Sequence, residues 1–145
     1  MSDPIHIPDA LLRIVDLFAS SPKPVKLQAL LDYSERLPAP PDHADTSEME
    51  LVPECQSTFL LGAEVGEDGT VQMWFEAPRE APTTRGFAAI IAEGLAGSTA
   101  EEILAVPDDV SRHLGLSEAV SPLRMRGMDA ILQRLKHQIR RQLGG

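Results

Sequence analysis

The sequence predicts an α+β fold, in which a small antiparallel sheet of about three strands packs against several helices. Apolar residues recur at helical spacing near both ends of the chain, and they alternate with a period of two between residues 57 and 76. With 145 residues and 43% apolar content, the chain has the size and composition of one domain with its own core. We expect a single domain over residues 1–145, with flexible tails at 1–7 and 142–145.

The first predicted elements are two short amphipathic helices that pack as a hairpin. Pro8 and Asp9 open the first, and "SSPKP" at 20–24 separates it from the second. The two apolar stripes consist of Leu11, Ile14, Val15 and Phe18, and of Leu27, Leu30 and Leu31. Residues 37–50 are rich in proline, small and acidic side chains without either period, which indicates a surface connection.

A β-hairpin is predicted over residues 57–76. Apolar residues alternate on both arms, and Asp68-Gly69 supplies the turn. Because a lone two-stranded ribbon is marginal in water, residues 49–53 are expected to add a short third strand. Trp74 falls on the outward face of its strand, where it either anchors an interface or is covered by a helix or loop.

The remainder of the chain is predicted to be helical. A Thr99/Glu102 capping box opens one helix, and the last helix starts with Ser121 as N-cap and Pro122 at its first position. An earlier helix has an apolar stripe of Phe87, Ile90, Ile91 and Leu95. The last helix is expected to bury Met128, Ile131, Leu132, Leu135 and Ile139.

Charge and composition argue against several classes of function. A net charge of -9 and only 4% aromatic residues disfavour a nucleic-acid partner. Apolar runs fall far short of the roughly 18 residues that a membrane span needs, and the N-terminus lacks a signal pattern. We therefore expect a cytoplasmic protein without membrane contact. The four histidines show no metal-ligand spacing with each other or with Cys55, so no metal site is expected.

Cys55, in the stretch "LVPECQS", is the only cysteine of the chain. A lone thiol excludes a disulfide within the chain and fits a reducing compartment. Its polar neighbours Glu54, Gln56 and Ser57 place it on a loop near the surface. Since Glu54 is anionic and no histidine is adjacent, the flanking residues do not lower the pKa of the thiol. This favours a thiol that is activated inside a partner's site.

Four further side chains are candidates for a functional role beside the cysteine. His43 and His113 are candidate general bases for a Cys/His pair, although both lie in polar stretches typical of solvated histidines. Arg124 falls in the first turn of the last helix, where positive charge costs about 0.3–1 kcal/mol. A local rule broken in this way marks a candidate functional site, with a solvated arginine as the alternative. Arg85, which precedes Gly86 at the start of a predicted helix, is a further candidate.

The chain resembles the SufE family of sulfur-acceptor proteins from about Pro8 to Ile139. The matching blocks, in the family's order and separations, are "LLRIVDLF", "KLQALLDYSERLP", "CQS", "TRGFAAI", "GSTAEEIL", "LGL" and "SPLRMRGMDAI". The resemblance implies a SufE/NifU-like fold. It also implies a carrier that takes persulfide sulfur from a SufS-type cysteine desulfurase, stimulates that enzyme, and delivers the sulfur to a SufBCD-type scaffold for iron–sulfur cluster assembly.

The resemblance extends to single positions. Cys55 occupies the place of the sulfur-accepting cysteine, and Glu54 stands where the family usually has glycine. Positions that match partner-binding or loop-supporting residues of the family are Gln56, Ser57, Arg85, Gly86, Arg124 and Gly127. No cofactor is implied on this chain, since the persulfide on Cys55 is transient and pyridoxal phosphate belongs to the desulfurase. The resemblance leaves a homodimer open beside a monomer.

Two functions from other classes are alternatives. A thiol redox sensor needs an acidified cysteine and often a resolving cysteine, and the sequence shows neither. A non-catalytic interaction module, in a divergent paralogue, would dock through the acidic loop 42–50 or through the basic face of the last helix. Six of the thirteen lysines and arginines follow residue 120. Substitution of Cys55 with serine would leave the function of such a module intact.

Overall fold

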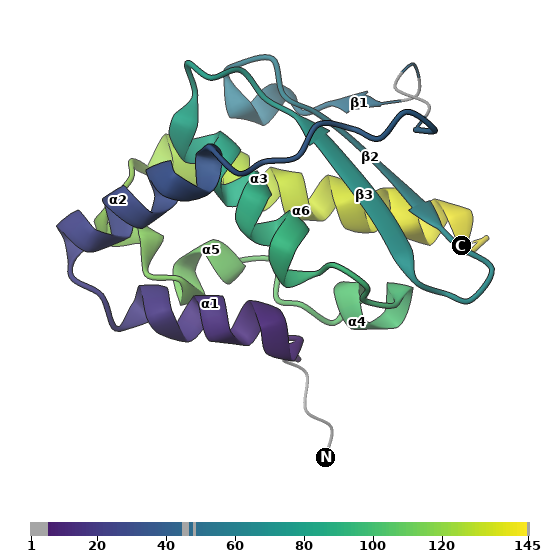
Figure 1. Ribbon diagram of the computed structural model, residues 1–145, viewed down its shortest axis with the longest axis horizontal. Coiled ribbons are helices and arrows are strands. Elements are labelled where there is room, and N and C mark those ends of the chain that lie inside the picture. Colours follow the sequence, from purple (N-terminus) through teal and green to yellow (C-terminus); the bar gives the residue numbers. More distant parts are fainter. Residues whose placement is uncertain (1–5, 45–46, 48, 145) are drawn as a thin grey trace.

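The computed structural model describes residues 6–44, 47 and 49–144 and confirms the predicted α+β class. Its antiparallel sheet has the strand order β1-β2-β3. The strands are β1 (Glu50–Leu51), β2 (Leu60–Val65) and β3 (Val71–Glu76). The α-helices are α1 (Asp9–Ala19), α2 (Lys23–Ser34), α3 (Pro82–Gly94), α4 (Ala100–Leu104), α5 (Val110–His113) and α6 (Pro122–Gln142). In Figure 1, α6 runs behind β2 and β3, and α1 lies on the side of the helical layer away from the sheet.

The two N-terminal helices form as predicted, but they pack mainly on α3 rather than on each other as a hairpin, and α2 buries a different face. Leu30 is fully buried, whereas Leu31 is 38% exposed and Lys26 is only 3% exposed. The Lys26 ammonium donates to a carboxylate oxygen of Glu118 at 3.0 Å, so the buried charge has a counter-ion. The prediction of an apolar stripe that includes Leu31 was wrong because a lysine takes part of the buried face.

The predicted β-hairpin is confirmed, and β1 is shorter than expected. Ala63 of β2 lies opposite Met73 of β3, and Gly69 adopts a φ of 87° in the connecting turn. The third strand ends at Leu51 because Pro53, which has no N–H to donate, opens a 3₁₀ turn. This turn carries the cysteine.

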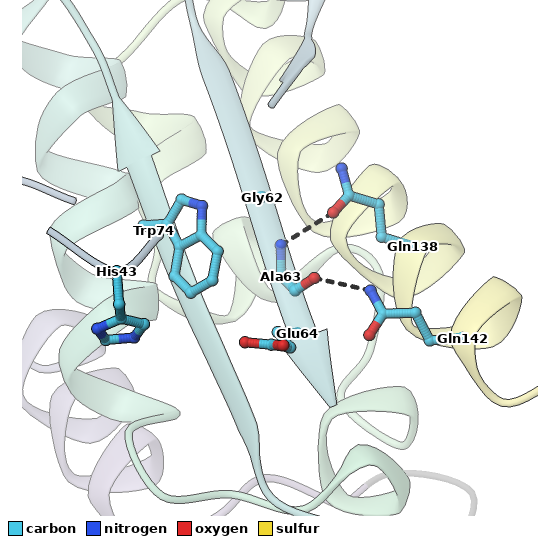
Figure 2. A pocket seen from close by; sticks show the side chains of 7 residues that line it. All are labelled: His43, Gly62, Ala63, Glu64, Trp74, Gln138 and Gln142. Carbon is cyan, nitrogen blue, oxygen red and sulfur yellow. Dashed lines mark hydrogen bonds between the residues drawn. The ribbon is translucent and has the colours of Figure 1, made fainter. Parts of the chain in front are cut away.

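Trp74 is covered rather than exposed, which decides between the two predicted alternatives. Its side chain is only 9% exposed, and the ring of His43 stands edge-on to it with centroids 6.4 Å apart. Gly62 on β2 makes room for the indole, since a Cβ at that position would lie 2.6 Å from the indole nitrogen. Figure 2 shows the tryptophan beside β2, between His43 and Ala63.

Two glutamines of α6 complete the edge of β2 that β1 leaves open (Figure 2). Gln138 accepts from the Ala63 N–H at 2.9 Å and donates to the Leu61 carbonyl at 3.3 Å. Gln142 accepts from the Val65 N–H at 2.8 Å and donates to the Ala63 carbonyl at 2.7 Å. A side-chain amide carries the same donor and acceptor as a peptide group, so α6 takes the place of a further strand here.

The predicted tails lie only partly within the described residues. Residues 1–5 and 145 lie outside the described residues. The His6 N–H donates to the Ala105 carbonyl at 3.4 Å, and Gln142 is the last residue of α6. The flexibility expected for 1–7 and 142–145 stays a prediction.

Replacing Gln138 with leucine is expected to lower the free energy of unfolding by about 1–3 kcal/mol, because the Ala63 N–H and the Leu61 carbonyl lose their partner. Urea unfolding measures this change. Gln28→Leu is the control, since the exposed Gln28 amide donates to Asp32 on its own helix, and should change the free energy by less than about 0.5 kcal/mol. Equal losses in the two variants would contradict the role of Gln138 at the sheet edge.

Candidate functional site

Cys55 is the last residue of a 3₁₀ turn, Pro53–Cys55, that lies between β1 and β2. The Cys55 N–H donates to the Val52 carbonyl at 3.2 Å. Gln56 then adopts a φ of 63°, and among the described residues it is the only non-glycine residue with a positive φ. Such a conformation is uncommon for a residue with a Cβ and marks strain beside the thiol.

Gly127 is the point at which α6 meets this turn. The Cys55 thiol makes a weak hydrogen bond, with its sulfur 3.7 Å from the Gly127 carbonyl oxygen. A Cβ at Gly127 would lie 3.2 Å from the Cα of Cys55 and 3.3 Å from the Glu54 carbonyl oxygen. The absent side chain therefore lets the turn rest directly on the helix backbone.

The thiol is half-buried, and its environment keeps it protonated. Burial raises the pKa of Cys55 to about 12, and the Glu54 carboxylate adds to this rise while Arg134 opposes it. The sequence-based expectation that the flanking residues do not lower the pKa is confirmed. In the resting protein, Cys55 is therefore a poor nucleophile.

Alkylation of native Cys55 by iodoacetamide is expected to accelerate about tenfold per pH unit from about pH 8 to about pH 10, since the thiolate fraction grows this way below a raised pKa. The denatured protein should level off at the top of this range. Because the fold favours the protonated thiol, the raised pKa of Cys55 contributes to the stability of the folded protein. This contribution is complete below the ordinary pKa of 9.0 and is lost as pH rises toward about 12. A native rate that levels off near the ordinary thiol pKa would contradict the raised value.

Glu54 is held by a charged network on α6. Arg134 donates from Nε and Nη2 to the two carboxylate oxygens of Glu54 at 3.2 and 3.1 Å, and from Nη1 to Glu50 at 2.7 Å. Gln138 donates to the other Glu50 oxygen at 3.0 Å. The hydrogen bonds from Arg134 hold the pKa of Glu54 below its usual value. Glu54 also needs no left-handed backbone, because the positive φ falls on Gln56.

Arg134 is a residue that sequence reasoning missed. Its carboxylate partners lie 80 and 84 positions earlier in the chain, so no local spacing in the sequence indicates the pairing. The available signal was weak and indirect: a carboxylate beside the cysteine, where the family usually has glycine, requires a counter-charge from elsewhere in the fold.

A cavity of about 440 Å³ opens beside Cys55. Gln56 and Ser57 line it, together with Ala81 and Ser121, the N-cap residues of α3 and α6. Arg124 lines it as well, and its Nη1 donates to the Thr83 hydroxyl at 2.8 Å. The predicted first-turn arginine thus links α6 to α3 at the edge of this cavity while its side chain stays exposed.

Arg85 and Gly86 do not line this cavity. Arg85 donates to the Ser34 carbonyl at 2.8 Å and to the Ala77 carbonyl at 2.5 Å, so it joins the end of α2 to the segment after β3. Gly86 faces the Leu30 carbonyl so closely that a Cβ would overlap it. Both residues therefore serve the packing of α2 against α3.

Neither candidate general base lies at the thiol. His43 Nε2 lies 3.2 Å from the Gln72 side-chain oxygen, and His113 lies 3.5 Å from the Asp109 carboxylate. Within the described residues, no group of three or more His, Cys, Asp or Glu side chains could hold a metal ion. No helix in the described part of the chain has the length and apolar character to cross a bilayer.

Comparisons with known proteins find a family model, related sequences and a similar solved structure. A model of the SufE family, described as an Fe-S metabolism associated domain, matches residues 12–139. An uncharacterized SufE-like protein of Mycobacterium tuberculosis is 46% identical over 140 residues, which cover 97% of this chain and 98% of the relative. The sulfur acceptor protein CsdE of Escherichia coli is 31% identical over 107 residues, or 73% of this chain and 71% of CsdE. A solution structure of a hypothetical protein from Thermus thermophilus has a TM-score of 0.84 and 41% identity, covering 96% of this chain and 99% of that one.

Proposed function

Given that the chain belongs to the SufE family, we propose that it accepts persulfide sulfur on Cys55 from a cysteine desulfurase and carries it to iron–sulfur cluster assembly. The observation that carries this proposal is the placement of Cys55, the only thiol of the chain, half-buried beside a cavity. The naming of CsdE as a sulfur acceptor supports it. The donor we propose is a SufS-type enzyme that holds its own pyridoxal phosphate, and the recipient is a SufBCD-type scaffold.

The transfer step is an exchange at sulfur. The Cys55 thiolate attacks the outer sulfur of the donor's cysteine persulfide, and the sulfur–sulfur bond of the donor breaks. The donor cysteine leaves as a thiolate, and the outer sulfur with its proton stays on Cys55 as a new persulfide. No oxidant or reductant is consumed, because one sulfur–sulfur bond forms as another breaks.

The resting protein is poorly prepared for this step, since its thiol is protonated and lies against Gly127. The thiolate therefore has to form in the complex with the donor, where the turn leaves this position. Arg124, at the edge of the same cavity, supplies a positive charge for the persulfide anion. The same high pKa disfavours the alternative of a thiol redox sensor, which needs an acidified cysteine.

A single-turnover reaction tests the proposal. A SufS-type desulfurase is loaded with persulfide from free cysteine, separated from substrate, and mixed with this protein without reductant. The intact mass of this protein should rise by one sulfur atom while that of the desulfurase falls by one. A loaded desulfurase that releases its sulfur to a small dithiol, but transfers none to this chain, would contradict the proposal.

A further inference from the structure

An ion-pair network ties the cysteine turn to the middle of α6. Arg134 makes a two-pronged contact with Glu54, which adjoins the thiol, and a third contact with Glu50 on β1. The side chains of Arg134 and Glu54 are only 30% and 37% exposed. The guanidinium therefore connects three elements at once: the turn, the sheet and the helix.

We propose that Glu54 and Arg134 form a latch that keeps the Cys55 turn against α6, and that Arg134 is a positioning residue for sulfur transfer. The role in transfer rests on the proposed function, whereas the latch itself rests on geometry alone. A bidentate contact between a guanidinium and a carboxylate is among the stronger hydrogen-bonded pairs in proteins. With both charges in place, the turn stays closed and the thiol stays shielded.

The other contacts of the turn are weak by comparison. A neutral thiol is a poor donor, and its sulfur lies 3.7 Å from the Gly127 carbonyl oxygen. Pro53 and Gln56 are exposed, and the strained φ of Gln56 favours a different arrangement of the turn once the latch is broken. The latch is thus the strongest side-chain link between this turn and α6 among the described residues.

The latch and the local charges predict opposite effects on the alkylation rate when Arg134 is lost. If charge acted only through the thiol, loss of Arg134 would raise the pKa of Cys55 and slow its alkylation, whereas loss of Glu54 would speed it. If the latch holds the turn, both losses free the thiol and both speed alkylation. Arg134 is therefore the residue whose substitution separates the two accounts.

The experiment measures alkylation of Cys55 by N-ethylmaleimide, a neutral reagent, without any desulfurase. Arg134→Gln and Glu54→Gln should each accelerate the reaction about two- to fivefold, the range that a partly exposed ion pair of this kind supports. The double variant should react no faster than the faster single variant, because both substitutions open the same latch. Arg134→Lys should fall between wild type and Arg134→Gln. A rate for Arg134→Gln at or below that of wild type would overturn the latch.

The dependence of the alkylation rate on ionic strength is a second readout. It separates an ion pair from a role of the Arg134 side chain in packing alone. Added salt weakens a partly exposed ion pair, so it should speed alkylation of the wild-type protein and leave the rate of Arg134→Gln unchanged. Arg141→Gln, at the exposed end of α6, is the matched control and should behave as wild type. A salt response equal in all three proteins would overturn the latch.

The sulfur-transfer reaction separates this inference from the proposed function. Faster alkylation of Arg134→Gln, with no transfer of sulfur to the wild-type protein, would support the latch and refute the carrier. Transfer of sulfur to Cys55, with unchanged alkylation in both single variants, would refute the latch and support the carrier.

Discussion

The Cys55→Ser protein is expected to leave the cysteine desulfurase at its basal turnover, without the stimulation that the proposed carrier function predicts for the wild-type protein. Stimulation requires removal of the persulfide from the donor, and a serine hydroxyl, ionised far less readily than a thiol, does not attack that sulfur. Production of alanine from cysteine, measured with a mild reductant, reports the turnover. Because the site is half-buried and serine is similar in size to cysteine, the thermal unfolding midpoint should change little.

The serine variant also provides its own control for binding. It retains the surface that meets the donor, so an excess of it should inhibit stimulation by the wild-type protein. Stimulation by Cys55→Ser equal to that of wild type would contradict the carrier function. That outcome would favour the interaction module, for which the thiol is incidental.

The Gly86→Ala protein is expected to lose about 1–3 kcal/mol of unfolding free energy, because the new methyl group overlaps the Leu30 carbonyl and forces α2 away from α3. The main chain of α2 cannot move aside as a flexible side chain would. The better helix propensity of alanine offsets only about 1 kcal/mol at most. The unfolding midpoint should fall by about 2–4 °C for each kcal/mol lost, measured by circular dichroism.

Gly66→Ala is the matched control for this substitution. A Cβ at Gly66 would lie 3.2 Å from a carboxylate oxygen of Asp68, which accepts from the Thr70 N–H and hydroxyl and needs to shift by only a few tenths of an ångström to make room. Its unfolding free energy should change by less than about 0.5 kcal/mol. Equal stability of Gly86→Ala and wild type would show that the two helices tolerate a wider separation.

Local signals in the sequence predicted the elements of this fold well. The Thr99/Glu102 capping box forms with both of its hydrogen bonds, and Ser121 accepts from the Arg124 N–H at 3.3 Å as the N-cap of α6. The hairpin register follows from alternation and from the Asp68-Gly69 turn. These features depend on residues within a few positions of each other, which a pattern in one sequence records directly.

Features that join distant segments could not be predicted in the same way. Lys26 reads as a solvated residue because its partner, Glu118, lies 92 positions away. Gln138 reads as an ordinary polar residue of a helix, although it completes the edge of β2. The role of Arg134 is hidden for the same reason. The sequence marked Cys55 as the site but placed its thiol near the surface, and only the packing of Gly127 shows how it is shielded.

Part of the basic face predicted for the last helix is used within the protein. Arg134 pairs with two carboxylates, and the buried Lys136 ammonium donates to the Val106 carbonyl and to Asp108. Arg124 contacts Thr83. These contacts give half of the six basic residues an internal partner, which weakens the case for this helix as the docking face of an interaction module.

The most direct test of the sulfur-carrier function is to locate the transferred sulfur. The protein is incubated with a SufS-type desulfurase and free cysteine without reductant, its thiols and persulfides are capped, and it is digested for peptide mass mapping. The carrier account predicts one or more added sulfur atoms on the peptide that contains Cys55, and none in the Cys55→Ser protein. An unmodified Cys55 peptide, with a desulfurase that loads another acceptor under the same conditions, would contradict it.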